Sequence, residues 1–283
     1  MTNPIHRTKK KNKKRLPEIN EDSYLYLDSL RDAFIQKRGY EYSQNQQDCD
    51  EFITLLLNEL HDEFVATHPD VSNRPESDEA HRSPLHKIFW GKTRSFINDK
   101  RGNEVPFLTI HLDILHKSIN SVNDALEYFL KKKNISECVS QELLLEETPE
   151  VLLLTLKRIK YTKYEIKKIA KRIDIPISLE IVNSLISPEE NEKRIGPSST
   201  HQKYQLVSII YHDGEYATDG HYVSTVYHPG YNCWILHDDT RITPISPNDL
   251  YHENKFGHPY MLFYRREDTI KDQNKPKHAF GIW

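Results

Sequence analysis

The sequence predicts an α+β protein in which a helical part packs against an antiparallel sheet. Apolar residues recur at helical spacing between residues 23 and 65, whereas short strand-like runs dominate from residue 151 onward. Hydrophobic residues make up 37% and aromatic residues 10% of the 283 residues. This supply of large apolar side chains excludes a wholly disordered chain.

Composition also limits the class of protein. No apolar run reaches the roughly 18 residues of a membrane span. The N-terminus is rich in lysine and has no apolar signal core, so we expect an intracellular protein of the cytoplasm or nucleus. Cys49, Cys138 and Cys233 are widely spaced, which favours free thiols over disulfides or a metal site.

Charge is unevenly distributed along the chain. The first fifteen residues carry seven basic and no acidic residues, which leaves 32 basic and 42 acidic residues elsewhere. We expect residues 1–18 to form a disordered basic arm, which fits a solvated tail, a localisation signal or a nucleic-acid contact. The acidic remainder favours a basic partner, although it also fits a simple role in solubility.

The helices and long loops come next. We expect a helix within residues 23–36 and a stronger one from about residue 46 to 65, which places Phe52, Leu56 and Leu60 on one face. Residues 66–84 and 181–202 are polar, contain proline and lack periodicity, so both are interpreted as surface loops. A short helix over residues 122–130 is capped by Ser121 or Asn120.

Strands account for most of the remaining prediction. Residues 151–156 are continuously apolar, which is typical of a strand buried on both faces. The other expected strands cover residues 88–97, 107–114, 204–211, 222–227, 233–236 and 260–264.

The candidate catalytic residues lie within residues 220–239, GHYVSTVYHPGYNCWILHDD. A tight turn at Pro229-Gly230 would pair residues whose numbers sum to 459, which sets His221 opposite Asp238. Such a pair is the base and its orienting acid in a nucleophilic triad, and Gly220 would leave room for a substrate backbone. A one-residue slip would bring in Asp239 and change its face, and geometry alone favours an ordinary pair of polar strands over a catalytic pair.

Four strings, in order, resemble blocks of the ubiquitin-specific protease family. They are SQNQQDCDEFITLLLNELHDEF (43–64), TPEVLLLTLKRI (148–159), YQLVSIIYHDG with DGHYVSTVY (204–227), and WILHDD with PYMLFYRR (234–266). The resemblance implies a papain-like cysteine peptidase fold of helical thumb, antiparallel β palm and fingers, N-terminally truncated. It divides the chain into the arm, a catalytic-type domain over residues 19–266 and a tail over residues 267–283.

The resemblance also implies roles for individual residues. His221 in DGHY matches the general base, and Asp238 matches the acidic third member. Asp48 in QQDCDEF matches a position expected to touch the basic tail of ubiquitin, although an acid there would also stabilise a helix N-terminus. Gln47, Gly220 and Tyr222 complete the expected substrate-binding set.

Two departures from the family pattern matter. Nothing in residues 1–42 resembles the block that holds the nucleophilic cysteine, and we expect Cys49 to be a buried structural thiol far from His221. Cys138 and Cys233 are not expected to act as nucleophiles either. In the fingers, Cys138 is the single cysteine where many family members hold zinc with four, so we expect no zinc and no other cofactor.

The expected function is therefore a ubiquitin carboxyl-terminal hydrolase homologue, a cysteine-type deubiquitinase by family, whose nucleophile is not found in this chain. The alternative is a catalytically inactive ubiquitin-binding pseudoenzyme. In either case the expected partner is ubiquitin or a ubiquitin-like protein, rather than a membrane or nucleic acid. We expect an imidazole nitrogen of His221 within about 3.5 Å of an Asp238 oxygen, and no detectable hydrolysis by this chain alone.

Overall fold

The computed structural model describes residues 28–39, 47–72, 83–131, 133–136, 139–161, 166–188, 190, 201–214, 219–251 and 253–270. The chain divides into two compact units, Met1–Asn45 and Gln46–Trp283, which are described separately. The predicted basic arm and residues 271–283 of the predicted tail lie outside the described residues.

The first unit contains one described helix, α1 (Asp28–Arg38). It covers the described part of the helix predicted within residues 23–36. Gly39 ends the helix with a φ of 87°, and its backbone N–H donates to the Ile35 carbonyl oxygen at 2.8 Å. Glycine adopts this left-handed conformation without the strain of a Cβ atom, so it is a favoured residue after a helix end.

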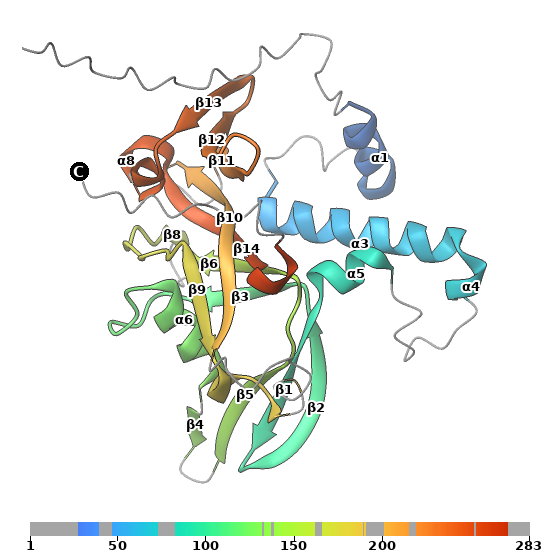
Figure 1. Cartoon of the computed structure of the whole chain (residues 1–283), viewed down its shortest axis with the longest axis vertical. Coiled ribbons are helices and arrows are strands. Elements are labelled where there is room, and N and C mark those ends of the chain that lie inside the picture. The colour runs from blue at the N-terminus through green and yellow to red at the C-terminus, as the bar shows by residue number, and fades with distance from the viewer. Residues whose placement is uncertain are drawn as a thin grey trace, which may run out of the picture. The chain divides into compact units, whose positions relative to one another are not determined.

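An eight-stranded sheet forms the centre of the second unit (Figure 1). Its strand order is β13-β12-β11-β10-β14-β6-β3, and β9 also pairs with β10. All neighbours are antiparallel except β3 and β6, which are parallel. The strands are β3 (Thr109–Asp113), β6 (Val151–Lys157), β9 (Ser178–Val182), β10 (His201–Asp213), β11 (His221–His228), β12 (Cys233–Asp238), β13 (Arg241–Ile245) and β14 (His258–Arg266).

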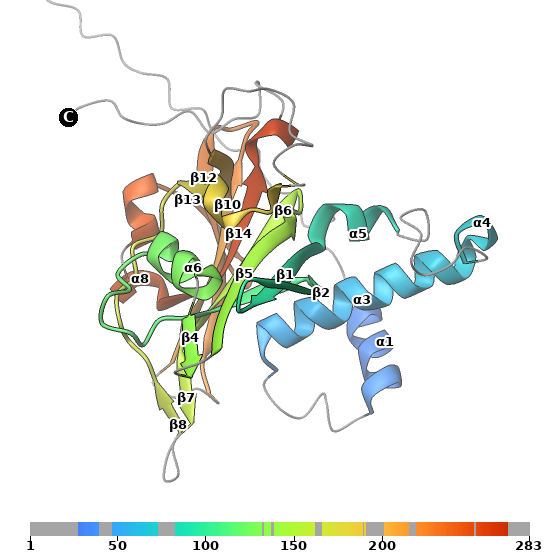
Figure 2. The same cartoon turned by 90° about the horizontal axis from the view of Figure 1, so that it is seen from below.

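The sheet is covered on both faces, which explains the continuous apolar run in β6. Leu152, Leu154 and Leu156 join the larger core with α6 (Val122–Leu130), whereas Leu153 faces the smaller core with Leu57. Figure 2 shows α6 on one side of the sheet and α3 with α5 on the other. The predicted helix over residues 122–130 is confirmed, and its cap is a reciprocal capping box of Ser121 and Asp124.

The thumb helix α3 (Cys49–Thr67) confirms the predicted second helix and extends it. It runs into the predicted loop over residues 66–84, where α4 (Pro69–Ser72) also lies. The strand predicted from residue 88 is wrong at its start, because α5 (Pro84–Phe89) includes Ile88 and Phe89 and the strand β1 begins only at Gly91. Ser83 accepts the His86 N–H and Pro84 occupies the first turn, which starts a helix there.

A second, four-stranded sheet forms the fingers, in the order β2-β1-β5-β4. The sequence predicted β1 but missed the other three. In β2 and β5, charged residues replace a regular apolar alternation. Arg94 lies among them, 2.9 and 3.0 Å from the two Glu146 oxygens and paired also with Glu104. The strands are β1 (Gly91–Ile97), β2 (Lys100–Phe107), β4 (Lys133–Ser136) and β5 (Val139–Glu147).

Smaller elements complete the unit. The loop predicted over residues 181–202 is shorter than expected, because β9 includes residue 182, η3 (Asn183–Leu185) follows and β10 begins at His201. Among the described residues, no helix is long and apolar enough to cross a membrane. The remaining elements are β7 (Ile159–Tyr161), β8 (Ile166–Lys168), η4 (Pro247–Tyr251), α8 (Glu253–Phe256) and η5 (Glu267–Thr269).

Candidate active site

His221 is the first residue of β11 and pairs with Asp213 at the end of β10. Gly220 precedes it at a point where the chain passes close to itself. A Cβ atom at Gly220 would lie against the His212 ring and 2.5 Å from the Asp213 carbonyl oxygen. The glycine is therefore required by the contact with β10, a reason different from the room for substrate that the sequence suggested.

The β11–β12 hairpin differs from its predicted register by two residues. Thr225 pairs with Leu236 and His228 with Cys233, so the paired numbers sum to 461 rather than 459. The turn contains four residues instead of Pro229-Gly230 alone, and Asn232 adopts a φ of 51° within it. A shift of two keeps every side chain on its original face, because strand side chains alternate with period two.

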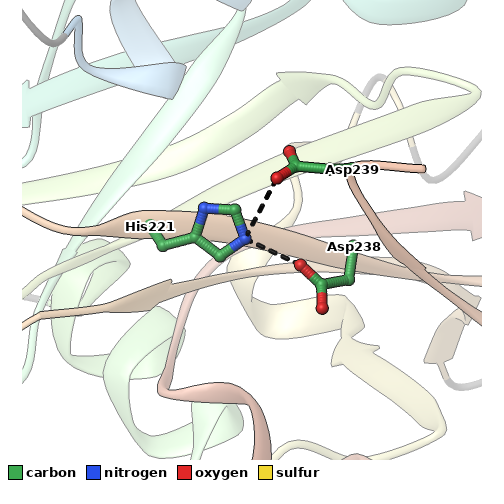
Figure 3. Close-up of side chains that lie close together, drawn as sticks. All are labelled: His221, Asp238 and Asp239. Carbon is green, nitrogen blue, oxygen red and sulfur yellow. Dashed lines mark hydrogen bonds and ion pairs between the residues drawn. The ribbon is translucent and has the colours of Figure 1, made fainter. Parts of the chain in front are cut away.

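His221 and Asp238 consequently meet as expected (Figure 3). The Nε2 atom of His221 lies 2.8 Å from Oδ1 of Asp238 and 4.0 Å from Oδ2 of Asp239. The His221 side chain is 47% exposed and that of Asp238 is 23% exposed. The predicted geometry of this pair is confirmed.

The electrostatics of the pair favour a protonated imidazole. The hydrogen bond to Asp238 raises the pKa of His221, and the nearby Asp239 charge adds to the effect. The same bond lowers the pKa of Asp238, assisted by Arg241 at 3.4 Å. Because Nε2–H donates to Asp238, the neutral imidazole presents Nδ1 as a proton acceptor, and Nδ1 makes no hydrogen bond to a described residue.

Among the described residues, one group has donor atoms close enough to hold a metal ion. It consists of His221, Asp238 and Asp239. One nitrogen and two carboxylate oxygens lie within 4.8 Å of one another. His221 already shares Nε2 with Asp238, and Asp239 is 79% exposed. The arrangement therefore suits proton transfer without requiring a metal ion.

Asp48 lies at the N-terminus of α3, where it acts as the N-cap. Its Oδ1 accepts the Asp50 and Glu51 backbone N–H groups at 2.8 and 3.4 Å, and its Oδ2 accepts a 2.7 Å hydrogen bond from the Tyr260 hydroxyl. The helix-stabilising interpretation of Asp48 is thus present in the structure. Gln47 directly precedes it and is half-buried.

Tyr222 lies on the opposite face of β11 from its neighbour His221. Its ring centroid is 4.9 Å from that of His212 and 6.1 Å from that of Tyr260. Burial and the nearby Asp48 charge raise the pKa of the Tyr222 hydroxyl, which keeps it a hydrogen-bond donor. The structure therefore brings Asp48, Tyr222 and Tyr260 together. His221 directly precedes Tyr222 in the sequence.

Tyr260 and the surroundings of Asp50 were not identified from the sequence. Asp50 Oδ2 lies 2.8 Å from His111 Nε2, and Asp50 Oδ1 accepts a 2.9 Å bond from the Thr155 hydroxyl. Burial would raise the pKa of Asp50, but these hydrogen bonds outweigh it and lower the pKa. These partners lie 61 to 212 residues apart, so local sequence patterns cannot pair them.

The described cysteines do not resemble nucleophiles. Cys49 is the first residue of α3 and is half-buried rather than buried as expected. Desolvation together with the Asp48 and Asp50 charges raises the pKa of its thiol. Burial also raises the pKa of Cys233. Both therefore remain thiols rather than reactive thiolates at neutral pH. Cys138 lies outside the described residues, and the separation of Cys49 from His221 stays a prediction.

Comparisons with known proteins identify the family. The family model described as ubiquitin carboxyl-terminal hydrolase matches residues 14–264. Ubiquitin carboxyl-terminal hydrolase 10 of Rattus norvegicus is 29% identical over 306 residues, covering 88% of this chain and 38% of that protein. Ubiquitin hydrolase B of Dictyostelium discoideum is 28% identical over 265 residues, covering 78% and 55%. The chain thus spans only part of the length of these relatives.

Solved structures give the same result for the fold. The SAGA Ubp8/Sgf11/Sus1/Sgf73 DUB module bound to ubiquitin aldehyde matches with a TM-score of 0.67 and 24% identity, over 82% of this chain and 52% of that chain. The yeast SAGA DUB module with an Sgf73 mutant matches with a TM-score of 0.62 and 26% identity, over 78% and 49%. The chain belongs to the ubiquitin carboxyl-terminal hydrolase family, and its fold is that of the ubiquitin-specific deubiquitinase domains.

Proposed function

We propose that this chain binds the C-terminal tail of ubiquitin, or of a ubiquitin-like protein, and places His221 beside it as the general base of a cysteine-type isopeptidase. The observation that carries the proposal is the 2.8 Å contact between His221 Nε2 and Asp238, which leaves Nδ1 available for a proton. Asp238 then fixes the imidazole orientation and stabilises its protonated form.

The chemistry assigned to this pair needs a thiol next to Nδ1. The imidazole would take the thiol proton, the thiolate would attack the isopeptide carbonyl carbon, and the imidazolium would return the proton to the departing lysine amine. Water would then hydrolyse the acyl-enzyme with the same imidazole as base. Neither Cys49 nor Cys233 has the low thiol pKa that this step requires.

We therefore propose that the 283 residues alone recognise ubiquitin without cleaving it, and that hydrolysis requires a cysteine supplied by a further segment or chain. An imidazole without a nucleophile could activate only water, at a poorly formed site. Support for the recognition role comes from the cluster of Asp48, Tyr222 and Tyr260 at the start of α3. Gln47 and Gly220 flank the same cluster in sequence and complete the proposed contact set.

A titration of isotope-labelled ubiquitin with the full chain, followed by NMR, tests recognition. The expected shifts concentrate in the C-terminal tail of ubiquitin and vanish when that tail is removed. Asp48→Asn retains the helix cap but loses the charge, so it should weaken binding about fivefold, or roughly 1 kcal/mol. Asp99→Asn, in the turn between β1 and β2, is the matched control and should leave the affinity for ubiquitin unchanged. Wild-type binding that does not need the tail would contradict the proposal.

A fluorogenic ubiquitin C-terminal amide tests the lack of cleavage. The purified chain is expected to release no detectable fluorophore. Turnover that disappears in His221→Ala would show that one of the three cysteines acts as the nucleophile after all. Turnover that survives His221→Ala would point to a contaminating enzyme, and repurification of both proteins would then decide between the two results.

A further inference from the structure

The hairpin of β7 and β8 carries a concentration of positive charge in a body that is otherwise acidic. Residues 157–172 include eight basic residues and one acidic residue. The two strands form a sheet of their own, separate from the palm and the fingers. Figure 2 shows them projecting at the lower end of the view. Such an isolated two-stranded hairpin has little stability of its own.

Two of these cations fasten the hairpin to the palm. Arg158 is 2% exposed and donates to the Pro259, Ile169 and Lys171 carbonyl oxygens at 2.6, 3.0 and 2.9 Å. Lys168 donates to the His212 carbonyl oxygen at 3.1 Å and also to that of Gly214. These contacts explain why the hairpin holds its position despite its small size.

Two other cations of the hairpin, Lys160 and Lys167, are exposed and have no ion-pair partner among the described residues. Lys160 lies directly opposite Lys167 across the two strands, which places both ammonium groups on one face. Like charges in this position destabilise a sheet. Neither lysine forms an ion pair with a described residue, and exposed Lys157 lies just before the hairpin. An arrangement that is unfavourable in the free protein becomes favourable when an anion binds across it.

The position of the hairpin connects it to the candidate active site. Lys168 donates hydrogen bonds to the carbonyl oxygens of His212 and Gly214, the two residues that flank Asp213 in sequence. Asp213 is the residue that pairs with His221 across β10 and β11. The hairpin that carries Lys160 and Lys167 therefore lies against the end of β10 that pairs with the candidate base.

We propose that the Lys160/Lys167 face docks an acidic segment of the protein to which ubiquitin is attached. This inference rests on the proposed function, since a macromolecule that passes His221 would then be a ubiquitin conjugate. An extended acidic segment places alternate carboxylates on one side, which matches two lysines on one face.

The first test measures binding of a labelled peptide of about twelve residues, with Glu and Ser alternating so that one side of the extended chain is acidic. Lys160→Glu/Lys167→Glu in the full chain should weaken this binding about tenfold or more, because each change replaces attraction by repulsion. The matched control, Lys87→Glu/Lys100→Glu, makes the same charge change on α5 and in the fingers, and should reproduce the wild-type affinity apart from a small long-range effect. Equal affinity for the two double variants would overturn the proposal.

The lysine-rich N-terminus also attracts acidic peptides, so the second test locates the contact. Acetylation of lysines, read by mass spectrometry, should slow at Lys160 and Lys167 when the acidic peptide is added, while Lys100 reacts unchanged. Protection confined to the first fifteen residues would overturn the proposal. So would a single-stranded oligonucleotide of equal charge that protects Lys160 and Lys167 better than the peptide does.

A third measurement separates this inference from the proposed function. Peptide binding is assayed without ubiquitin, and ubiquitin binding is assayed without the peptide. Protection of Lys160 and Lys167 by the peptide together with tail-dependent ubiquitin binding supports the assignment to a conjugated protein. Ubiquitin binding without peptide protection overturns the docking face alone. Peptide protection in a chain that does not bind ubiquitin overturns the assignment of the segment to a ubiquitin conjugate.

Discussion

His221 with Asp238 and His111 with Asp50 are both joined by a 2.8 Å contact through Nε2, and both histidine side chains are 47% exposed. The difference lies in the carboxylates. Asp50 is 15% exposed and uses its second oxygen to accept from the buried Thr155, whereas the second oxygen of Asp238 faces the exposed Arg241. A histidine–aspartate contact therefore joins a helix to a sheet in one place and raises the pKa of the candidate base in the other.

The largest expected effect is on the Asp50 pair. Asp50→Ala removes the acceptor of Thr155, whose residue is 2% exposed, and so leaves a buried hydroxyl without its bond. We expect the free energy of unfolding to fall by about 2 kcal/mol, measured by chemical denaturation. Asp50→Asn keeps the shape and one acceptor, and should lose about half as much.

The pH dependence provides a second check on Asp50. Its folded pKa is depressed below the ordinary value of 3.8, so its stabilising contribution is present above that value and is lost as pH falls through the folded pKa. The stability difference between the wild type and Asp50→Asn should therefore shrink in acid. A difference that stays constant down to the acid unfolding transition would contradict the structural assignment of this pair.

Tyr260→Phe should have the next largest effect. It removes the 2.7 Å bond to Asp48 but leaves the helix cap intact, because the cap uses the other oxygen of Asp48. We expect a loss of about 1 kcal/mol in the free energy of unfolding, the usual value for one hydrogen bond. Tyr204→Phe, which removes a bond to the Pro149 carbonyl oxygen away from α3, is a matched control for ubiquitin binding. Weakened binding in both variants would show a general loss of stability rather than a role at the site.

The contrast between the two pairs also shows what the sequence could predict. His221 and Asp238 were paired from a hairpin pattern alone, and a register error of two residues left the prediction intact because it preserved the faces. Six strands of the palm were predicted from their apolar residues, whereas β9 and β13 were missed. Gly220 was singled out for a substrate-binding role, which stays a prediction, and its contact with His212 could not be foreseen from spacing.

The features that the sequence did not predict depend on contacts between segments that are distant along the chain. Asp48 and Tyr260 are 212 residues apart, and Asp50 and Thr155 are 105 apart, so nothing local indicates that they meet. The strands β2 and β5 escaped prediction because their acidic residues Glu104 and Glu146 pair with Arg94 of β1 instead of alternating with apolar ones. Tertiary ion pairs replaced the hydrophobic pattern on which strand prediction relies.

Asp238→Asn should lower the pKa of His221 with little effect on the free energy of unfolding. The carboxylate raises the pKa of His221, so the variant should show a lower pKa in an NMR titration of the imidazole protons. In the wild type the raised pKa means that the contribution of His221 to stability is present at low pH and is lost as pH rises through the folded pKa. A pKa of His221 that is unchanged in Asp238→Asn would remove Asp238 as the orienting acid.

Arg241→Ala should have the smallest effect on stability and on the pKa of His221. It tests directly how the carboxylate of Asp238 differs from that of Asp50. Arg241 lies 3.4 Å from Asp238 but is 82% exposed, so the ion pair is screened by solvent and its loss should not be resolved by chemical denaturation. The Arg241 charge helps to lower the pKa of Asp238 and competes with His221 for that carboxylate. Its removal should therefore raise the pKa of His221 slightly, opposite in sign to the effect of Asp238→Asn. A fall in the His221 pKa in Arg241→Ala would mean that Arg241 positions Asp238 toward the imidazole, and the tuning of this base would then depend on a third residue.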